Sequence, residues 1–259
     1  MQRIAEYAKQ SVPQAHELDS EENLKTRAMD ACRPCISLIE STNQNTFLVY
    51  DGLMGLTNLA SVSDSVRERI IREGGCHHID FQMLEDNEAL RRAATQCICN
   101  LALSDKFKER YRPEDENSTE PVDRLKAIFV FCGDEEYHTR IAALGAVAYL
   151  TSDVRICKCI INIGSFEEIV KETICIEDQG IRHRILVILQ NLLASDKDVA
   201  EKIINTQIFE CLLALQMGIG SQGGVMKDIL NNCMTAAKHW GLIQSNPGEY
   251  VYTAPTAQQ

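Results

Sequence analysis

The sequence contains few groupings of side chains that could carry out chemistry on a substrate. Cys32 and Cys35 form a CxxC pair, but a thioredoxin-like redox motif needs a preceding strand and a βαβ setting, and the sequence predicts neither. Cys76, His77 and His78 could begin a zinc site. Zinc requires four ligands in a tetrahedral arrangement, however, and no second ligand pair lies at a suitable spacing. We therefore expect these residues to have packing roles, with no metal and no cofactor bound.

The other cysteine pairs and the glycines also lack the features of an active site. Cys97 and Cys99, like Cys157 and Cys159, are two residues apart, which on a helix turns one thiol about 200° from the other. The glycine-rich segment 218–224 follows a predicted helix rather than a strand, so we interpret it as the link before the last long helix. The sequence has no phosphate loop, dinucleotide-binding fingerprint or nucleophile elbow. These features predict a protein that is not an enzyme.

Recurring asparagines are the strongest candidates for a binding site. Asn58, Asn100 and Asn191 occupy one equivalent position on three predicted long helices, and Tyr149 occupies it on a fourth. Asparagine is unfavourable inside a helix because its amide competes for backbone groups, so its recurrence requires an explanation. One hypothesis is a ladder of amides on a concave face that pairs with the backbone of an extended peptide, each bond contributing about 1 kcal/mol. The alternative is that each asparagine ties neighbouring loops together.

Further candidate residues share the register of these asparagines. Met54 and Gln96 lie four residues before two of them and complete the predicted partner-binding groove. Arg91, Arg140 and Arg182 form a second recurring set, nine residues before the asparagine or tyrosine of each long helix. We favour a structural role for these arginines, holding helix ends or an acidic neighbour. A secondary contact with the partner is the alternative.

The elements that must position these residues repeat along the chain. Asn58, Asn100, Tyr149, Asn191 and Asn232 follow one another at successive intervals of 42, 49, 42 and 41 residues. The first four long helices are followed by the pairs Ser63-Asp64, Ser104-Asp105, Ser152-Asp153 and Ser195-Asp196. A period near 42 residues with helical content is the signature of HEAT or armadillo arrays. We predict an all-α, right-handed armadillo-like α-solenoid of about five to six three-helix repeats.

Each repeat is predicted to contain a short, a middle and a long helix. The predicted bounds are 66–71, 77–84 and 88–103 in the second unit and 154–163, 166–176 and 179–194 in the fourth. Ser63 is expected to cap the first of these helices, Ser65 and Glu68 have capping-box spacing, and Gly74 is expected to end the helix. Small residues dominate the third long helix, around Gly145, which would let neighbouring units approach closely.

An insertion explains the longest interval, the 49 residues from Asn100 to Tyr149. Residues 112–121 are polar, acidic and bracketed by prolines, which predicts a loop insertion. We interpret it as a solvated linker between units, with contact to a basic partner as the alternative. Residues 1–243 are assigned to one array, with helices also expected at 1–18 and 24–39. Residues 244–259 are expected to form a disordered tail.

The amino-acid composition limits the cellular compartment and the classes of partner that we expect for this protein. The formal net charge of −11 disfavours nucleic acid, since nucleic-acid binding normally needs a basic face. The sequence has no signal peptide and no apolar stretch of about 18 residues, so no membrane partner is expected. The 11 cysteines, an odd number set in apolar helix faces, indicate buried free thiols in a reducing cytosol. We predict a cytoplasmic protein.

Several segments, taken in order along the chain, resemble one known family. Residues 53–61 (LMGLTNLAS) and 69–73 (RIIRE) are similar to the UCS domain of the myosin-directed chaperones. So are residues 90–104 (LRRAATQCICNLALS), and residues 123–126 and 142–152 continue the resemblance in order. These ordered blocks are far more specific than generic armadillo patterning.

This resemblance, over roughly residues 45–240, implies an armadillo array that helps to fold, assemble and maintain the myosin motor domain in the cytoplasm, in cooperation with Hsp90. Animal members dock Hsp90 through an N-terminal tetratricopeptide module, and we expect this chain to correspond to the C-terminal part of the array without that module. The nuclear-import armadillo class has tryptophan where this chain has Met54, Gln96 and Val187, which disfavours a nuclear-signal receptor. The predicted function is a non-enzymatic chaperone that binds the myosin motor domain in its groove. The alternative is a general armadillo adaptor for another partner.

Overall fold

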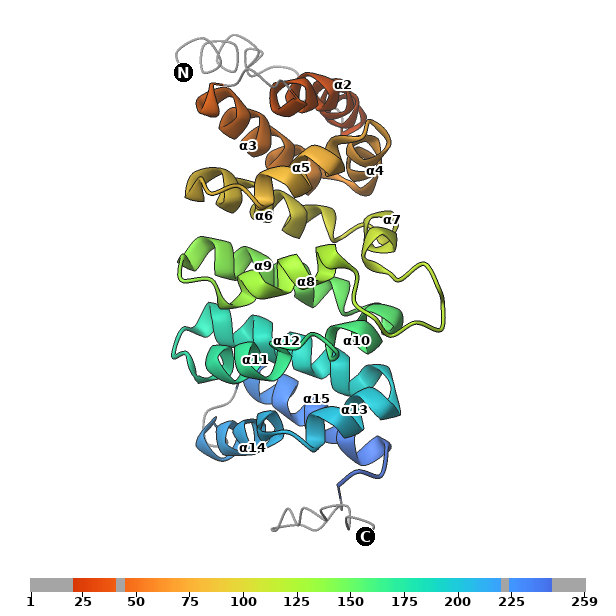
Figure 1. The fold of residues 1–259 in the computed structure, drawn as a ribbon, viewed down its shortest axis with the longest axis vertical. Coiled ribbons are helices and arrows are strands. Elements are labelled where there is room, and N and C mark those ends of the chain that lie inside the picture. Colours follow the sequence, from red (N-terminus) through yellow and green to blue (C-terminus); the bar gives the residue numbers. More distant parts are fainter. Residues whose placement is uncertain (1–20, 41–44, 220–223, 244–259) are drawn as a thin grey trace.

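The computed structural model describes residues 21–40, 45–219 and 224–243. Every regular element in these ranges is a helix, and the helices stack along one axis into an elongated solenoid (Figure 1). The prediction of an all-α solenoid is therefore confirmed. The helix predicted at 1–18 and the tail predicted at 244–259 lie outside the described residues.

A pair of helices is followed by four units of three helices each in this part of the chain. The pair is α2 (Glu21–Glu40) and α3 (Thr46–Val62). The first two units are α4 (Asp64–Arg72), α5 (Gly75–Met83) and α6 (Glu88–Leu101), then α7 (Asp105–Lys108) with η1 (Glu109–Tyr111), α8 (Asp123–Val130) with η2 (Phe131–Gly133), and α9 (Tyr137–Leu150). The last two are α10 (Val154–Ile160), α11 (Phe166–Cys175) and α12 (Gln179–Ser195), then α13 (Lys197–Ile204), α14 (Gln207–Ile219) and α15 (Val225–His239).

The Ser-Asp pairs mark the starts of the short helices, but the capping residue differs between units. Ser63 caps α4 through a hydrogen bond that its hydroxyl accepts at 3.4 Å, whereas Asp153 and Asp196 cap α10 and α13. The predicted capping box is wrong. Because α4 begins at Asp64, Ser65 lies inside the helix, and its hydroxyl pairs with that of Ser63 at 2.9 Å.

Apolar side chains of the long helices α3, α6, α9, α12 and α15 form a continuous core. Two residues before the recurring asparagine or tyrosine lie Leu56, Ile98, Val147, Leu189 and Leu230, each at most 1% exposed. Each long helix packs on the next one along the chain. A unit thus buries its apolar face against its neighbours, which is how solenoids obtain their stability.

Helices α6 and α9 approach each other closely at Gly145. A Cβ atom at this position would lie 2.7 Å from Sγ of Cys99, which is shorter than any ordinary van der Waals contact. Ala142, Ala143 and Ala146 of the same helix are buried. The small residues noted in the sequence therefore set the spacing between the unit that ends with α6 and the unit that ends with α9.

The predicted insertion at 112–121 contains no helix. Pro113 and Pro121 are buried, whereas residues 114–117 between them are exposed. The side-chain amide of Asn162, just after α10, donates a hydrogen bond to the carbonyl oxygen of Thr119 at 2.9 Å. The insertion is thus a loop docked onto the following unit, and Figure 1 shows it beside α7 and α10.

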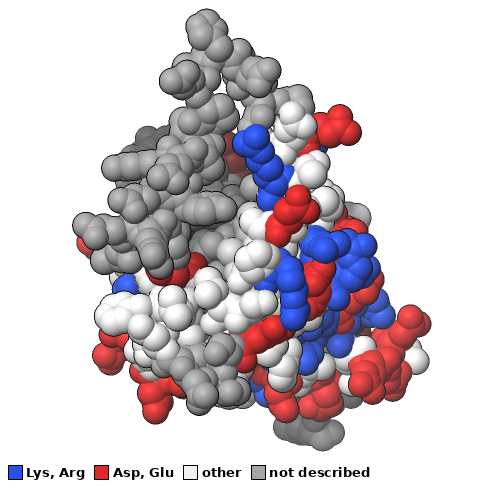
Figure 2. Space-filling model, turned by 90° about the horizontal axis from the view of Figure 1, so that it is seen from above, with Lys and Arg blue, Asp and Glu red and all other residues white. Residues whose placement is uncertain are grey.

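Charged side chains gather on one flank of the solenoid. In the end-on view of Figure 2, Lys and Arg interleave with Asp and Glu on the right, the side on which Figure 1 places α4, α7, α10 and α13. Pairs such as Arg112–Asp153 at 2.5 Å and Lys158–Asp196 at 2.9 Å link successive units there. Exposed ion pairs each contribute at most about 1 kcal/mol, so they supplement the apolar core rather than replace it.

The close approach at Gly145 predicts the effect of adding one methyl group. We expect Gly145→Ala to destabilise the protein by about 1–3 kcal/mol, because the new Cβ would overlap Cys99. Gly218→Ala, in α14, is the matched control, since a Cβ there meets nothing within 4 Å. Urea unfolding followed by circular dichroism measures both. Equal stability of the two variants would show that the α6–α9 spacing does not depend on the glycine.

Candidate partner-binding groove

The predicted groove residues lie on α3, α6, α9 and α12, in a row that crosses four long helices. We refer to the outward side of these helices, which carries these residues, as the long-helix face. Asn58 is exposed and Tyr149 is 43% exposed. The half-buried members are Met54, Gln96, Asn100 and Asn191.

Two of the recurring asparagines bond to the preceding long helix. Nδ2 of Asn100 donates to the carbonyl oxygen of Thr57 at 2.9 Å. Nδ2 of Asn191 donates to the carbonyl oxygen of Ala148 at 3.0 Å and to Oγ1 of Thr151 at 3.1 Å. These bonds tie units together, but their backbone acceptors lie in the long helices α3 and α9 rather than in the loops that the second hypothesis expected. An amide also has a second N–H and an oxygen, so a tied asparagine keeps some capacity to bond a partner.

The ladder changes at two other positions. Asn232 on α15 donates to Oε1 of Gln190 at 3.2 Å, so a side chain there replaces the backbone acceptor. On α9, Tyr149 stands in place of the asparagine and presents an aromatic ring to solvent. The long-helix face therefore combines amides with an aromatic side chain near its middle.

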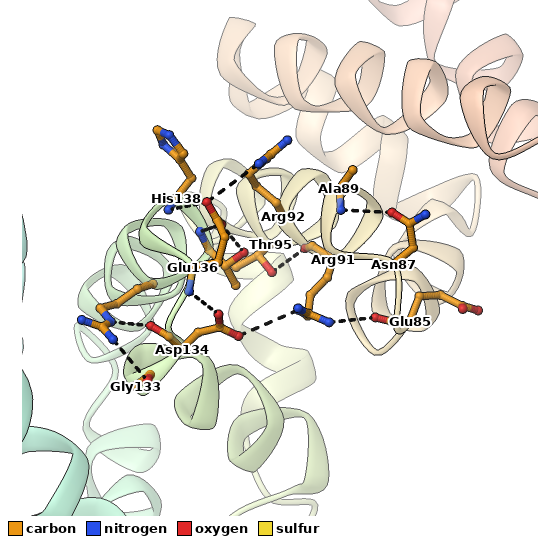
Figure 3. Close-up of polar contacts among 12 residues, drawn as sticks. Glu85, Asn87, Ala89, Arg91, Arg92, Thr95, Gly133, Asp134, Glu136 and His138 are labelled. Atoms are coloured by element: carbon orange, nitrogen blue, oxygen red, sulfur yellow. Dashed lines mark hydrogen bonds and ion pairs between the residues drawn. The ribbon is translucent and has the colours of Figure 1, made fainter.

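Two of the three recurring arginines donate hydrogen bonds to the loops that precede their own helices. Nη1 of Arg91 donates to the carbonyl oxygen of Glu85 at 3.2 Å (Figure 3), and Nε of Arg140 donates to that of Asp134 at 2.6 Å. In both cases the acceptor lies six residues before the arginine. The buried Nε of Arg182 has no hydrogen-bond partner among the described residues. Arg91 and Arg140 thus have the structural contacts that we favoured from the sequence.

Two acidic residues connect the unit of α6 to the unit of α9. Asp134 lies 3.8 Å from Nε of Arg91, and Glu136 lies 3.8 Å from Nη1 of Arg92 (Figure 3). Glu136 also caps α9, accepting a hydrogen bond from the backbone N–H of Thr139 at 2.6 Å. Partial burial alone would raise the pKa of Glu136, but the hydrogen bonds from Thr139 and the charge of Arg92 outweigh it, so that this pKa is lowered.

A depression of about 290 Å³ lies on the long-helix face beside Tyr149. His183 and Arg184 of α12 line it together with Gly145. The repeat pattern in the sequence points to Tyr149 but to neither His183 nor Arg184. A signal was present, because Arg184 lies two helical turns before Asn191 and so shares its face. An aromatic wall beside a guanidinium can receive an aromatic or acidic side chain of a partner.

The cysteines singled out from the sequence lack the features of a reactive or metal-binding site in the described part of the chain. Burial, the largest cause, raises the pKa of Cys32 to about 11, whereas a reactive CxxC cysteine has a lowered pKa. Burial likewise raises the pKa of Cys76 to about 11. In the described ranges, no cluster of three or more His, Cys, Asp or Glu side chains could hold a metal ion. No helix in those ranges is both long and apolar enough to cross a membrane.

The fold and the long-helix face define an armadillo-type α-solenoid. A designed armadillo repeat protein in complex with the peptide (KR)4 has 14% sequence identity and a TM-score of 0.68, and covers 86% of this chain and 87% of its own. This likeness concerns the fold alone. No protein-family model matches the sequence.

Relatives of higher identity specify the family. The mouse protein unc-45 homolog B is 33% identical over 188 residues, which is 72% of this chain and 19% of the relative. UNC-45 from Drosophila melanogaster has a TM-score of 0.74 at 31% identity, covering 84% of this chain and 27% of that chain. The chain belongs to the UNC-45 family of UCS-domain myosin chaperones. It spans about a fifth of the length of the mouse relative.

Two further solved structures concern partners of the family. A study of an UNC-45 chaperone describes features critical for binding and folding muscle myosin, and its structure has a TM-score of 0.72 at 30% identity, covering 82% of this chain and 23% of that chain. UNC-45 from C. elegans was solved with an Hsp90 peptide, with a TM-score of 0.68 at 29% identity over 82% of this chain and 22% of that chain.

The ties made by Asn100 predict different outcomes for two equivalent asparagines. Asn100→Ala and Asn58→Ala gain the same helix propensity, but only Asn100→Ala loses a tie to Thr57. We expect Asn100→Ala to be less stable than Asn58→Ala by about 1 kcal/mol, measured by urea unfolding. If the two variants unfold at the same urea concentration, the inter-unit hydrogen bond contributes nothing measurable.

The lowered pKa of Glu136 predicts a pH-dependent contribution to stability. Because the folded-state pKa lies below the ordinary glutamate value of about 4.3, the contribution is present above that value and is lost as the pH falls through the folded-state pKa. We expect Glu136→Gln to lose about 1 kcal/mol at neutral pH and less in acid. The exposed neighbour Glu135 supplies the control variant Glu135→Gln. This variant should leave the free energy of unfolding unchanged at both pH values. If the loss of stability in Glu136→Gln is the same at neutral and acidic pH, the prediction is contradicted.

Proposed function

We propose that this chain is a non-enzymatic chaperone segment that binds the myosin motor domain on its long-helix face and assists its folding, assembly and maintenance. The observation that carries the proposal is the similarity to UNC-45 over most of the chain. It includes a solved UNC-45 chaperone described as binding and folding muscle myosin.

The long-helix face has properties that suit a partly folded client. It crosses four long helices and offers exposed amide and aromatic side chains, Asn58 and Tyr149, next to a depression lined by Arg184. Amides bond backbone groups whatever the neighbouring side chains are, and aromatic side chains often supply a large share of binding energy. Such a surface can hold an extended segment with limited dependence on its sequence.

Hsp90 is a second partner that the family suggests, because UNC-45 from C. elegans was solved with an Hsp90 peptide. We do not assign Hsp90 to the long-helix face, since the described residues form armadillo-type triplets rather than tetratricopeptide pairs. The proposed compartment is the cytoplasm. The eleven free cysteines support it, because reducing conditions keep thiols unpaired.

The test is heat-induced light scattering of a purified myosin motor domain with and without an equimolar amount of this chain. We expect the wild-type chain to suppress scattering. Tyr149→Ala should weaken this protection, with a loss of affinity of about tenfold or more, as for an interface aromatic. Tyr137→Ala is the matched control: it removes a tyrosine of similar exposure, 45% against 43%, from the opposite end of α9.

The outcomes separate the groove assignment from the function itself. If Tyr149→Ala and Asn58→Ala protect myosin as well as wild type and Tyr137→Ala do, the client site is not the long-helix face. If the wild-type chain gives no protection while circular dichroism shows a folded helical protein, the chain alone is not a myosin chaperone. In that case an adaptor for another partner becomes the better hypothesis.

A further inference from the structure

The thiols of this protein are almost all shielded from solvent. All eleven cysteines lie in the described ranges, and seven of them are buried while three are half-buried. Cys175, the last residue of α11, is the only one that is exposed. An oxidant in solution therefore meets Cys175 before the other thiols, because exposure governs access to cysteine oxidation.

Cys175 faces a second cysteine across an interface between units. Helices α11 and α14 pack against each other, and Nζ of Lys171 donates to Oε1 of Gln207 across that interface at 3.0 Å. Cys175 and Cys211 each lie four residues further along the same two helices. One helical turn returns a side chain to the same face, so the two cysteines form the next rung of the same contact.

The pKa of Cys211 reflects the nearness of the Cys175 thiol. Burial raises the pKa of Cys211 most, and the charge and hydrogen bonding of the neighbouring Cys175 thiol raise it further. Glu210 raises it as well, while Lys171 lowers it. Cys211 is therefore the protected thiol of the pair, and Cys175 is the accessible one. A redox-sensitive site has this form, with an exposed cysteine beside a resolving cysteine.

We propose that Cys175 and Cys211 form a reversible intramolecular disulfide that staples α11 of one unit to α14 of the next when the protein meets a peroxide. The Cys175 thiolate attacks one oxygen of hydrogen peroxide, the O–O bond breaks, and hydroxide leaves, giving a sulfenic acid. The Cys211 thiolate then attacks the Cys175 sulfur and expels the sulfenic oxygen as hydroxide, which takes up a proton. Two thiols and one peroxide thus yield one disulfide and two molecules of water.

The disulfide would restrict how two neighbouring units of the solenoid move relative to each other. Each unit of a solenoid contacts only its neighbours, so a covalent link across one interface fixes the relative position of those two units. The units joined here contain the long helices α12 and α15, whose side chains Gln190 and Asn232 are hydrogen-bonded to each other. Reduction by a dithiol or glutathione would reverse the link, as for other transient cytosolic disulfides. This inference does not depend on the proposed myosin function.

The test treats the reduced full chain with hydrogen peroxide, blocks remaining thiols with an alkylating agent, and maps the products by mass spectrometry. We expect one disulfide per chain between Cys175 and Cys211, a loss of two hydrogen masses, and a thermal midpoint raised by a few degrees and restored by dithiothreitol. Cys175→Ser and Cys211→Ser should each abolish the midpoint shift. Cys99→Ser, which removes another half-buried thiol, should keep it.

Three results would overturn the proposal. The first is oxidation of Cys175 to sulfinic or sulfonic acid with the Cys211 thiol still free. The second is a disulfide that links two chains through Cys175 and runs as a dimer on a non-reducing gel. The third is the mapped disulfide without any change of thermal midpoint, because a link that fails to stabilise the α11–α14 interface does not staple the units.

Discussion

The packing of each long helix on the next is the interaction on which the rest of this structure depends. A three-helix unit of about 42 residues has too little apolar surface to form a core alone. Leu56, Ile98, Val147, Leu189 and Leu230 are buried because successive units supply the other wall of the core. Small residues at the α6–α9 contact, Gly145 above all, let the helices come near enough for that wall to close.

Polar contacts then select one register among the ways in which such helices could stack. Apolar packing is non-directional, whereas a hydrogen bond requires specific atoms at a specific distance. The ties from Asn100 to Thr57 and from Asn191 to Ala148 therefore fix how far one helix can slide along its neighbour. Glu136 and Arg92 add an ionic contact between α9 and α6, near the first turn of each helix.

The asparagine positions link this architecture to the proposed function. Asn100 and Asn191 lie on the long-helix face and tie its helices together. Asn58 and Tyr149, which reach further into solvent than Asn100 and Asn191, are the better candidates for contact with a client. The middle helices α11 and α14 bring two further thiols, Cys175 and Cys211, near each other.

The sequence by itself determined the helical repeat, its period, the loop at 112–121 and the row of side chains along the long helices. These follow from turns and from apolar spacing within one helix, which are local properties. Only the tertiary structure decided what Asn100 bonds, because its acceptor lies 43 residues away, and no local pattern pointed to the pairing of Glu136 with Arg92 or of Cys175 with Cys211. Contacts of this kind depend on the angle and spacing between units, which are set by how the buried side chains of neighbouring helices fit together.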